Sequence, residues 1–133
     1  MVLNSTKIGN YYDSEFTLNR GKFAKYNTLS NWYDFNSEER TNLVMNSKKL
    51  KQTSYENAIL LTTGATEATN LQNIYDIAGN VWEWTLEKTY NDDKLCALRG
   101  GGCNHNGLTI ASYRNNNNTS DNNYNIGFRI SFY

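Results

Sequence analysis

The 133-residue chain contains no proline, a single histidine and only two cysteines, and its 13 basic residues are balanced by 13 acidic ones. Zero net charge leaves no basic excess for a nucleic-acid face, so we expect no nucleic-acid partner. Cys96 and Cys103 are too few for a disulfide framework, and we expect reduced thiols rather than a bridge between them. The lack of proline beside abundant asparagine, lysine and tyrosine is typical of AT-rich coding DNA.

Long apolar runs are also missing. The longest apolar cluster, 58–61, is far shorter than a membrane-spanning helix, so no membrane insertion is expected. The length predicts one domain, residues 1–133. No apolar signal segment follows Met1, although the chain could be the C-terminal part of a longer protein. These features predict neither the localisation nor the oligomeric state.

The most informative stretch is 73–84, NIYDIAGNVWEW. In a strand, residues two apart face the same way, so Trp82 and Trp84 share one face and Glu83 points to the other. The preceding turn contains Gly79 and carries Asp76 back toward Glu83. Two carboxylates and several turn carbonyls at one point are hard oxygen ligands, which suit calcium. In the alternative, Glu83 simply accepts hydrogen bonds from turn amides.

Other elements are read from local pattern. Asn36 and Glu39 form a capping-box pattern, which predicts a helix over Ser37–Ser47 that covers the tryptophans. Short strands are expected around Phe16 and Leu18, at the end of a weaker element over 50–61, over Leu95–Arg99 before the glycine triplet 100–102, and over Ile126–Tyr133, where Phe128, Ile130 and Phe132 share one side. Phosphate binding by the triplet is disfavoured, because no Lys-Ser/Thr follows it.

Nine asparagines crowd into residues 104–125. Asparagine with Tyr113 and Tyr124 offers uncharged donors, acceptors and flat rings, which adaptable recognition surfaces use. A plain solvated loop is the alternative. We define residues 103–125 as the polar segment and expect it to bind the ligand, with contacts from Cys103, Asn104, His105, Asn106, Tyr113, Asn115, Asn116, Asn117, Asn118, Asp121, Asn122, Asn123 and Tyr124.

The sequence resembles the formylglycine-generating-enzyme, or sulfatase-modifying-factor, family. The resemblance rests on 73–84, Arg99–Gly102, 111–114 and 125–129, and it is strong over the last half of the chain. It implies an α+β domain with a C-type lectin-like fold: short twisted strands, one or two helices and much irregular loop. The chain ends are then expected to pair, with Arg129 placed against a buried acid or a tryptophan.

The same resemblance bears on chemistry. The two copper-binding cysteines of the oxidising members would fall at His105 and Ile110, so neither is present and no copper is expected. Related iron enzymes need a histidine cluster, and His105 is the only histidine. We expect His105 to be an exposed loop residue. An oxidase or another enzyme of this fold remains the alternative to a non-catalytic binding domain.

Non-catalytic members include phage proteins and the variable proteins of diversity-generating retroelements. By resemblance, this chain would bind a protein or glycan on a cell surface through the polar segment, as a retroelement-diversified protein or as a prophage tail or receptor-binding protein. The family's calcium loop maps onto the side chains of Asp76 and Glu83 and the carbonyls of Gly79 and Val81. Calcium is therefore a possible cofactor.

Overall fold

The computed structural model describes residues 4–18, 20–26, 31–34, 45–46, 49–51, 58–90, 94–121 and 123–130. Its strands are β1 (Glu15–Thr17), β2 (Lys22–Lys25), β3 (Tyr33–Asp34), β4 (Met45–Asn46), β5 (Lys49–Lys51), β6 (Ile59–Leu61), β7 (Asn70–Leu71), β8 (Ile74–Tyr75), β9 (Trp82–Lys88), β10 (Cys96–Arg99), β11 (Asn115–Asn117) and β12 (Ile126–Gly127). The 3-10 helix η3 (Glu67–Thr69) precedes β7.

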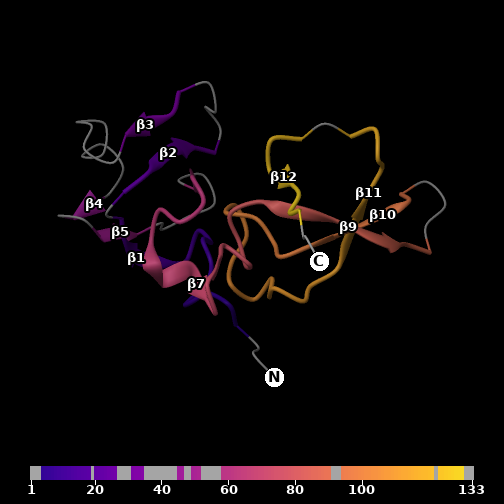
Figure 1. Ribbon diagram of the computed structural model, residues 1–133, viewed down its shortest axis with the longest axis horizontal. Helices are drawn as coiled ribbons and strands as arrows, with labels where there is room; N and C mark the ends of the chain where they lie inside the picture. The colour runs from indigo at the N-terminus through magenta and orange to yellow at the C-terminus, as the bar shows by residue number, and fades with distance from the viewer. Residues whose placement is uncertain are drawn as a thin grey trace.

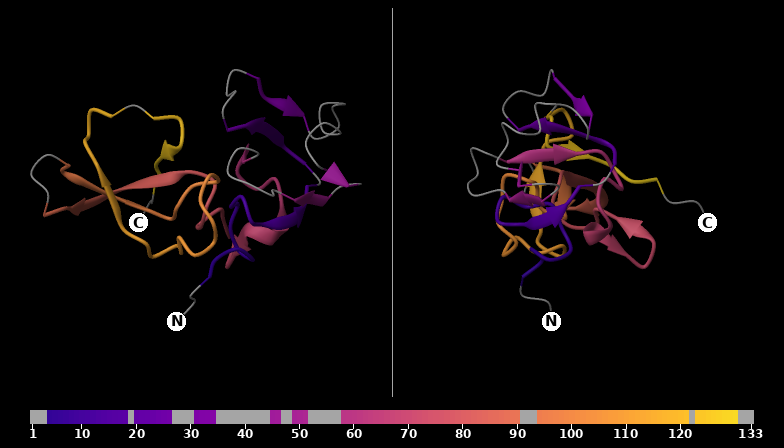
Figure 2. Two further views of the ribbon diagram at one scale, coloured as in Figure 1. Left: turned by 180° about the vertical axis from the view of Figure 1, so that it is seen from behind. Right: turned by 90° about the vertical axis from the view of Figure 1, so that its left-hand side faces the viewer.

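Short strands form several small sheets rather than one large one. Strands β1, β5 and β4 pair in that order, as do β3, β2 and β6, while β7 and β8 form a hairpin. The largest sheet has the order β11-β10-β9-β12. The small N-terminal sheets and this four-stranded sheet lie at opposite ends of the long axis (Figures 1 and 2).

Strand β6 lies between two hydrophobic clusters. Ile59 and Leu61 pack with Leu18 and Phe23, whereas Leu60, between them in sequence, packs on the other side with Cys103. All three residues of β6 are at most 3 % exposed. Because alternate side chains of a strand point to opposite faces, one short apolar strand joins both cores.

A buried amide joins the two ends of the molecule. The Asn80 side chain accepts from Leu61 N and donates to Leu61 O, both at 2.9 Å, as a neighbouring strand would. Asn10 Nδ2 donates to Asn80 Oδ1 at 3.0 Å and to Ile59 O at 2.7 Å. Asn80 O in turn accepts from Cys103 N at 2.8 Å. With φ of 62°, Asn80 adopts a left-handed conformation that asparagine tolerates better than most residues.

The predicted strands around Trp82 and Cys96 are confirmed as β9 and β10. They pair antiparallel, with Leu98 opposite Trp84 and Arg99 opposite Glu83, and the register shifts between Cys96 and Leu98. The strand near Phe16 and the one at the end of 50–61 are also present, as β1 and β6.

The closing strand differs from its prediction. Its described part, β12, pairs in parallel with β9 through Ile126 and Trp82 rather than with the N-terminal residues. Ser5 N donates to Gly107 O at 2.7 Å instead. Phe128 and Ile130 are 72 % and 67 % exposed, so their shared side is not covered by other described residues.

The expected helix over Ser37–Ser47 is wrong at its C-terminal end. Met45–Asn46 is strand β4, which pairs with β5, and β5 pairs also with β1. Pairing across the sheet outweighs the helix pattern there. Residues 35–44 lie outside the described part of the chain. In the described ranges the only helical residues are those of η3, so the strands of the expected α+β fold are present and an α-helix is not among the residues described.

Among the described residues, no helix is long and apolar enough to cross a membrane.

Candidate functional site

Arg129 organises the turn that precedes β9. Its guanidinium pairs with the Glu83 carboxylate and donates to the carbonyl oxygens of Asp76 and of Tyr75, the latter at 2.7 Å. Glu83 is the more buried partner, with 19 % of its side chain exposed against 34 % for Arg129. The sequence placed Arg129 against an acid, which this ion pair confirms. We call these contacts the arginine clamp.

Burial acts on both carboxyl groups of this region. Desolvation raises the pKa of Glu83 above its usual value, although the positive charge of Arg129 opposes the shift. The pKa of Asp76 is also raised by burial, against hydrogen bonds from the Thr69 side chain and from Gly64 N, which lies 3.3 Å from Oδ2. The folded structure therefore disfavours negative charge here except where the guanidinium compensates it.

The clamp bears directly on the calcium hypothesis. Of the predicted oxygen ligands, the Glu83 carboxylate is already paired with a cation, and the Asp76 side chain accepts a hydrogen bond from Gly64 N, while the same guanidinium also binds the Asp76 carbonyl. A calcium ion at this point would have to lie beside that positive charge or displace it. As arranged, the two carboxyl groups do not fit the ion. Within the described ranges, no group of three or more His, Cys, Asp or Glu side chains lies close enough to hold a metal.

The glycine triplet forms the base of the polar segment. Gly100 and Gly101 have φ of 92° and 77°, in the left-handed region that favours glycine. Gly79 N donates to Gly100 O at 2.7 Å, which ties the triplet to the central turn. The Tyr11 hydroxyl lies 2.9 Å from Gly100 O and 2.8 Å from Thr109 O, and burial raises its pKa to about 12. The base of the segment is thus buried and hydrogen-bonded.

Two predicted contact residues beside the triplet face inward. Cys103 is fully buried in the cluster with Leu60, so its inclusion among the ligand contacts is corrected: the core, and not a ligand, surrounds it. His105 packs edge-on against Trp82, with ring centroids 5.3 Å apart, and is half-buried rather than exposed as expected. Burial lowers its pKa, and Nδ1 has no hydrogen-bond partner among the residues that the structure describes.

Most of the other predicted contacts lie at the surface. Tyr113 and Tyr124 are 51 % and 53 % exposed, and each ring rests on one inner ring, Trp82 and Tyr26 respectively. Residues 118–125, which we call the arch, run from β11 to β12 (Figure 1). Asn115, Asn118, Asp121 and Asn123 are exposed, Asn104, Asn106, Asn116 and Asn117 are partly buried, and Asn122 lies outside the described residues.

The two thiols do not meet. Both cysteines are free, as expected; Cys103 is buried and Cys96 is partly exposed on β10. Burial raises the pKa of Cys103 to about 12, so this thiol stays protonated at neutral pH and is a poor nucleophile or metal ligand. Neither His105 nor Ile110 provides a sulfur ligand. A two-thiolate copper site therefore cannot form from this pair as placed.

Sequence reasoning missed two features of this region. Asn80 and Asn10 were not singled out, because nothing local distinguishes a buried amide from a turn amide. Thr119, on the arch, was also passed over, although it borders the pocket described below. A threonine among asparagines carries no pattern that marks it.

Comparisons with known proteins identify the family. No curated protein and no solved structure matches the chain. The sulfatase-modifying factor enzyme 1-like domain matches residues 5–131, nearly the whole chain, and not only the half that carries the recognisable motifs. The protein therefore belongs to the family of sulfatase-modifying factor enzyme 1-like domains.

Proposed function

We propose that this protein is a non-catalytic member of its family, a domain that binds a protein or glycan on a cell surface through the polar segment. The observation that carries the proposal is the contrast between the base and the rim of that segment. Its base, at Gly100–Cys103, is buried and hydrogen-bonded, whereas Tyr113, Tyr124 and three of its described asparagines, Asn115, Asn118 and Asn123, are exposed. A polar rim held at both ends on strands suits recognition.

The positions of the two cysteines favour a protein without copper oxidase chemistry. The family's two cysteine positions hold His105 and Ile110, and the nearest cysteine in sequence, Cys103, is buried with a raised pKa. Oxidation of a substrate thiol through copper(I) requires accessible thiolates. The chain offers one partly exposed thiol, Cys96 on β10, whereas Cys103 lies in the turn that follows the glycine triplet.

The proposal includes an origin in a phage or in a diversity-generating retroelement. The neighbouring DNA tests this part. A reverse transcriptase gene with an imperfect repeat of the coding region for 104–125 supports diversification. A phage structural-gene cluster without such a repeat supports an undiversified tail or receptor-binding protein. Neighbouring DNA that contains neither would contradict the proposed origin and leave the binding function untouched.

Binding is tested with labelled domain on a glycan array and on a displayed peptide library. For the best ligand found, Tyr113→Ala and Tyr124→Ala should each weaken binding about tenfold or more, because exposed tyrosines are common hot spots. Tyr90→Ala is the matched control, since Tyr90 is 98 % exposed and outside the segment. All three variants should keep their melting temperature within a few degrees.

Two outcomes would overturn the proposal. Copper-dependent oxygen consumption with a cysteine-containing peptide would make the protein an oxidase. Ligand binding that is unaffected by both segment variants but lost in the Tyr90 variant would move the site elsewhere.

A further inference from the structure

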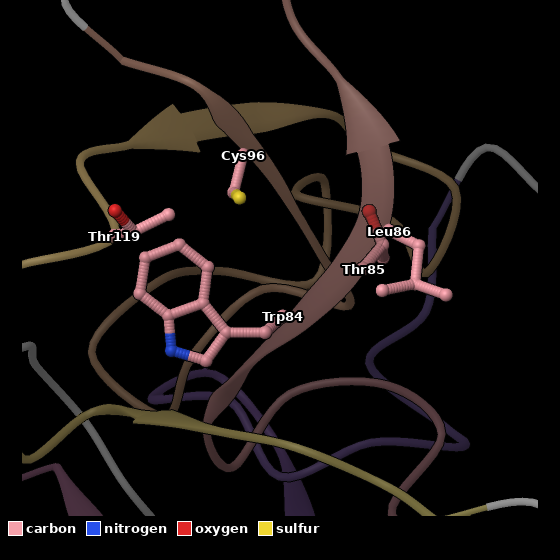
Figure 3. A pocket seen from close by; sticks show the side chains of 5 residues that line it. All are labelled: Trp84, Thr85, Leu86, Cys96 and Thr119. Atoms are coloured by element: carbon pink, nitrogen blue, oxygen red, sulfur yellow. The ribbon is translucent and has the colours of Figure 1, made fainter.

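A pocket of about 300 Å³ opens on one face of the four-stranded sheet. It is lined by Trp84, Thr85, Leu86, Cys96 and Thr119, which come from β9, β10 and the arch. In Figure 3 the Trp84 indole extends from β9 toward Cys96 and Thr119, and Leu86 extends from the other side of the strand. The pocket thus joins the tryptophan motif to the polar segment.

The apolar face of β9 continues beyond the core. Trp82 and Trp84 share a face of the strand, and Leu86 follows where the register of β9 against β10 shifts, beside Trp84 in the lining of the pocket. Exposure increases along the strand: Trp82 is 3 % exposed, Trp84 is partly buried, and Leu86 is fully exposed at 106 %. Nothing in the described chain covers the outer end of this apolar row.

The charged groups on the other face of the same strand are already paired. Glu87 pairs with Arg99 at 2.7 Å and with Arg114 at 3.0 Å, and Arg114 also lies over the Tyr90 ring. The two faces of the hairpin therefore differ: one is saturated by ion pairs within the chain, and the other presents uncovered apolar atoms. An incoming group gains most by burying the second face.

The lining points to the chemistry of the occupant. None of the five lining residues is charged, so a charged group would be desolvated there without a partner. The Thr85 hydroxyl already donates to Ala97 O at 3.0 Å. A sugar ring would therefore leave most of its hydroxyl groups unpaired in the pocket, which costs binding energy. An uncharged apolar side chain has no charge or hydroxyl group to leave unpaired in the pocket.

The size of the pocket and the residues at its rim also bear on which kind of partner it binds. A second copy of the chain would need about 800 Å² of surface per partner, far more than five side chains around one pocket provide. The rim is neutral and polar: Asn117 lies opposite Cys96 in the β10–β11 register, so its amide is on the face that holds the pocket. Such amides can pair with the backbone of a peptide whose side chain enters the pocket.

We propose that this pocket receives a single uncharged apolar side chain, aromatic or aliphatic, from a protein partner bound by the polar segment. The inference rests on the proposed function and deepens it, because it selects protein over glycan as the partner. It also assigns Trp84, Leu86 and Thr119 to the site, none of which is an asparagine of the segment.

The test uses N-acetyl-phenylalanine amide as the probe and methyl glucoside as the comparison, with the Trp84 indole N–H followed by NMR. The phenylalanine amide should shift that resonance saturably, and the glucoside should not. Leu86→Ser should weaken the response about tenfold through lost apolar contact. Leu108→Ser, at a leucine 64 % exposed and outside the pocket, is the matched control.

One further variant and one further readout complete the test. Thr119→Tyr fills the pocket at an exposed position and should abolish the response without unfolding the chain. The amide should also slow alkylation of Cys96 by iodoacetamide, with the buried Cys103 silent in both conditions.

Each alternative has its own signature. A saturable glucoside response without one to the amide would overturn the inference in favour of a glycan. Leu86-dependent self-association would assign the surface to a second copy and overturn it as well. If neither probe binds while Tyr113→Ala still weakens binding of the selected ligand, the pocket inference fails and the proposed function stands.

Discussion

The arginine clamp provides the sharpest test of how the chain holds its central turn. Arg129→Ala removes a guanidinium that contacts Glu83 and the backbone of Tyr75 and Asp76. The variant leaves a carboxylate with only 19 % of its side chain exposed and without its cation. Because such a charge keeps its desolvation cost and loses its compensation, the folded state should be clearly destabilised.

The magnitude follows from the number of bonds and their exposure. Hydrogen bonds to charged groups contribute about 1.5–3 kcal/mol when buried, and exposed ion pairs about 0–1 kcal/mol. The clamp lies between these limits, so about 1 kcal/mol for each of its three contacts gives a loss of about 3 kcal/mol. For a domain of this length that loss corresponds to a melting temperature lower by roughly 10 °C.

Thermal unfolding followed by circular dichroism measures the effect. Arg114→Ala is the matched control, because its partner Glu87 is 39 % exposed against 19 % for Glu83 and stays paired with Arg99, and it should cost less than about 1 kcal/mol. Chelator should leave the melting temperature of the unmodified protein unchanged if the guanidinium is the cation of this turn. An Arg129→Ala variant as stable as the control would refute the reasoning, and a melting temperature that falls with chelator would restore calcium.

Three further predictions follow from other sites. Burial raises the pKa of Asp76 above its ordinary value of 3.8, so its contribution to stability is full below that value and is lost as pH rises through the folded-state pKa. Asp76→Asn should therefore gain stability relative to the unmodified protein between pH 4 and pH 7 in urea titrations. A difference in unfolding free energy between the two proteins that stays the same over this pH range would contradict this. Gly79→Ala should cost more than about 3 kcal/mol, since its Cβ would lie 2.3 Å from a backbone oxygen at φ of 68°, whereas Gly64→Ala, at φ of 75° with ordinary contacts of 3.8 Å to the Tyr75 ring, should cost about 1 kcal/mol; equal losses would show that the contact is relieved. A thiol reagent should label Cys96 in the native protein and Cys103 only in denaturant, and rapid labelling of both would place Cys103 at the surface.

Features with a local signature were predicted correctly. The alternation of Trp82 and Trp84 identified β9, and the apolar run before the glycine triplet identified β10. The predictions of unusual backbone at Gly79 and at the triplet are matched by positive φ angles at Gly79, Gly100 and Gly101. Periodicity and glycine act over a few residues, so the sequence carries them without reference to the rest of the fold.

Features that depend on partners distant in sequence were not predicted correctly. The strand at Met45–Asn46, the parallel pairing of β12 with β9, and the inward position of His105 all result from contacts across the molecule. Nothing near residue 105 indicates that its ring will meet Trp82. The same holds for Thr119, whose place beside Trp84 exists only because the arch returns over the sheet.

The sequence by itself determined the family, the tryptophan strand, the glycine turns and the loss of cysteine at the positions of His105 and Ile110, because residue identity and short spacing are enough for each. Tertiary structure alone decided which cation pairs with Glu83 and which thiol is buried. It also decided that a pocket opens at the end of β9 that the rest of the described chain leaves exposed. These depend on how far burial extends and on which side chain arrives from the far end of the chain, and local pattern encodes neither.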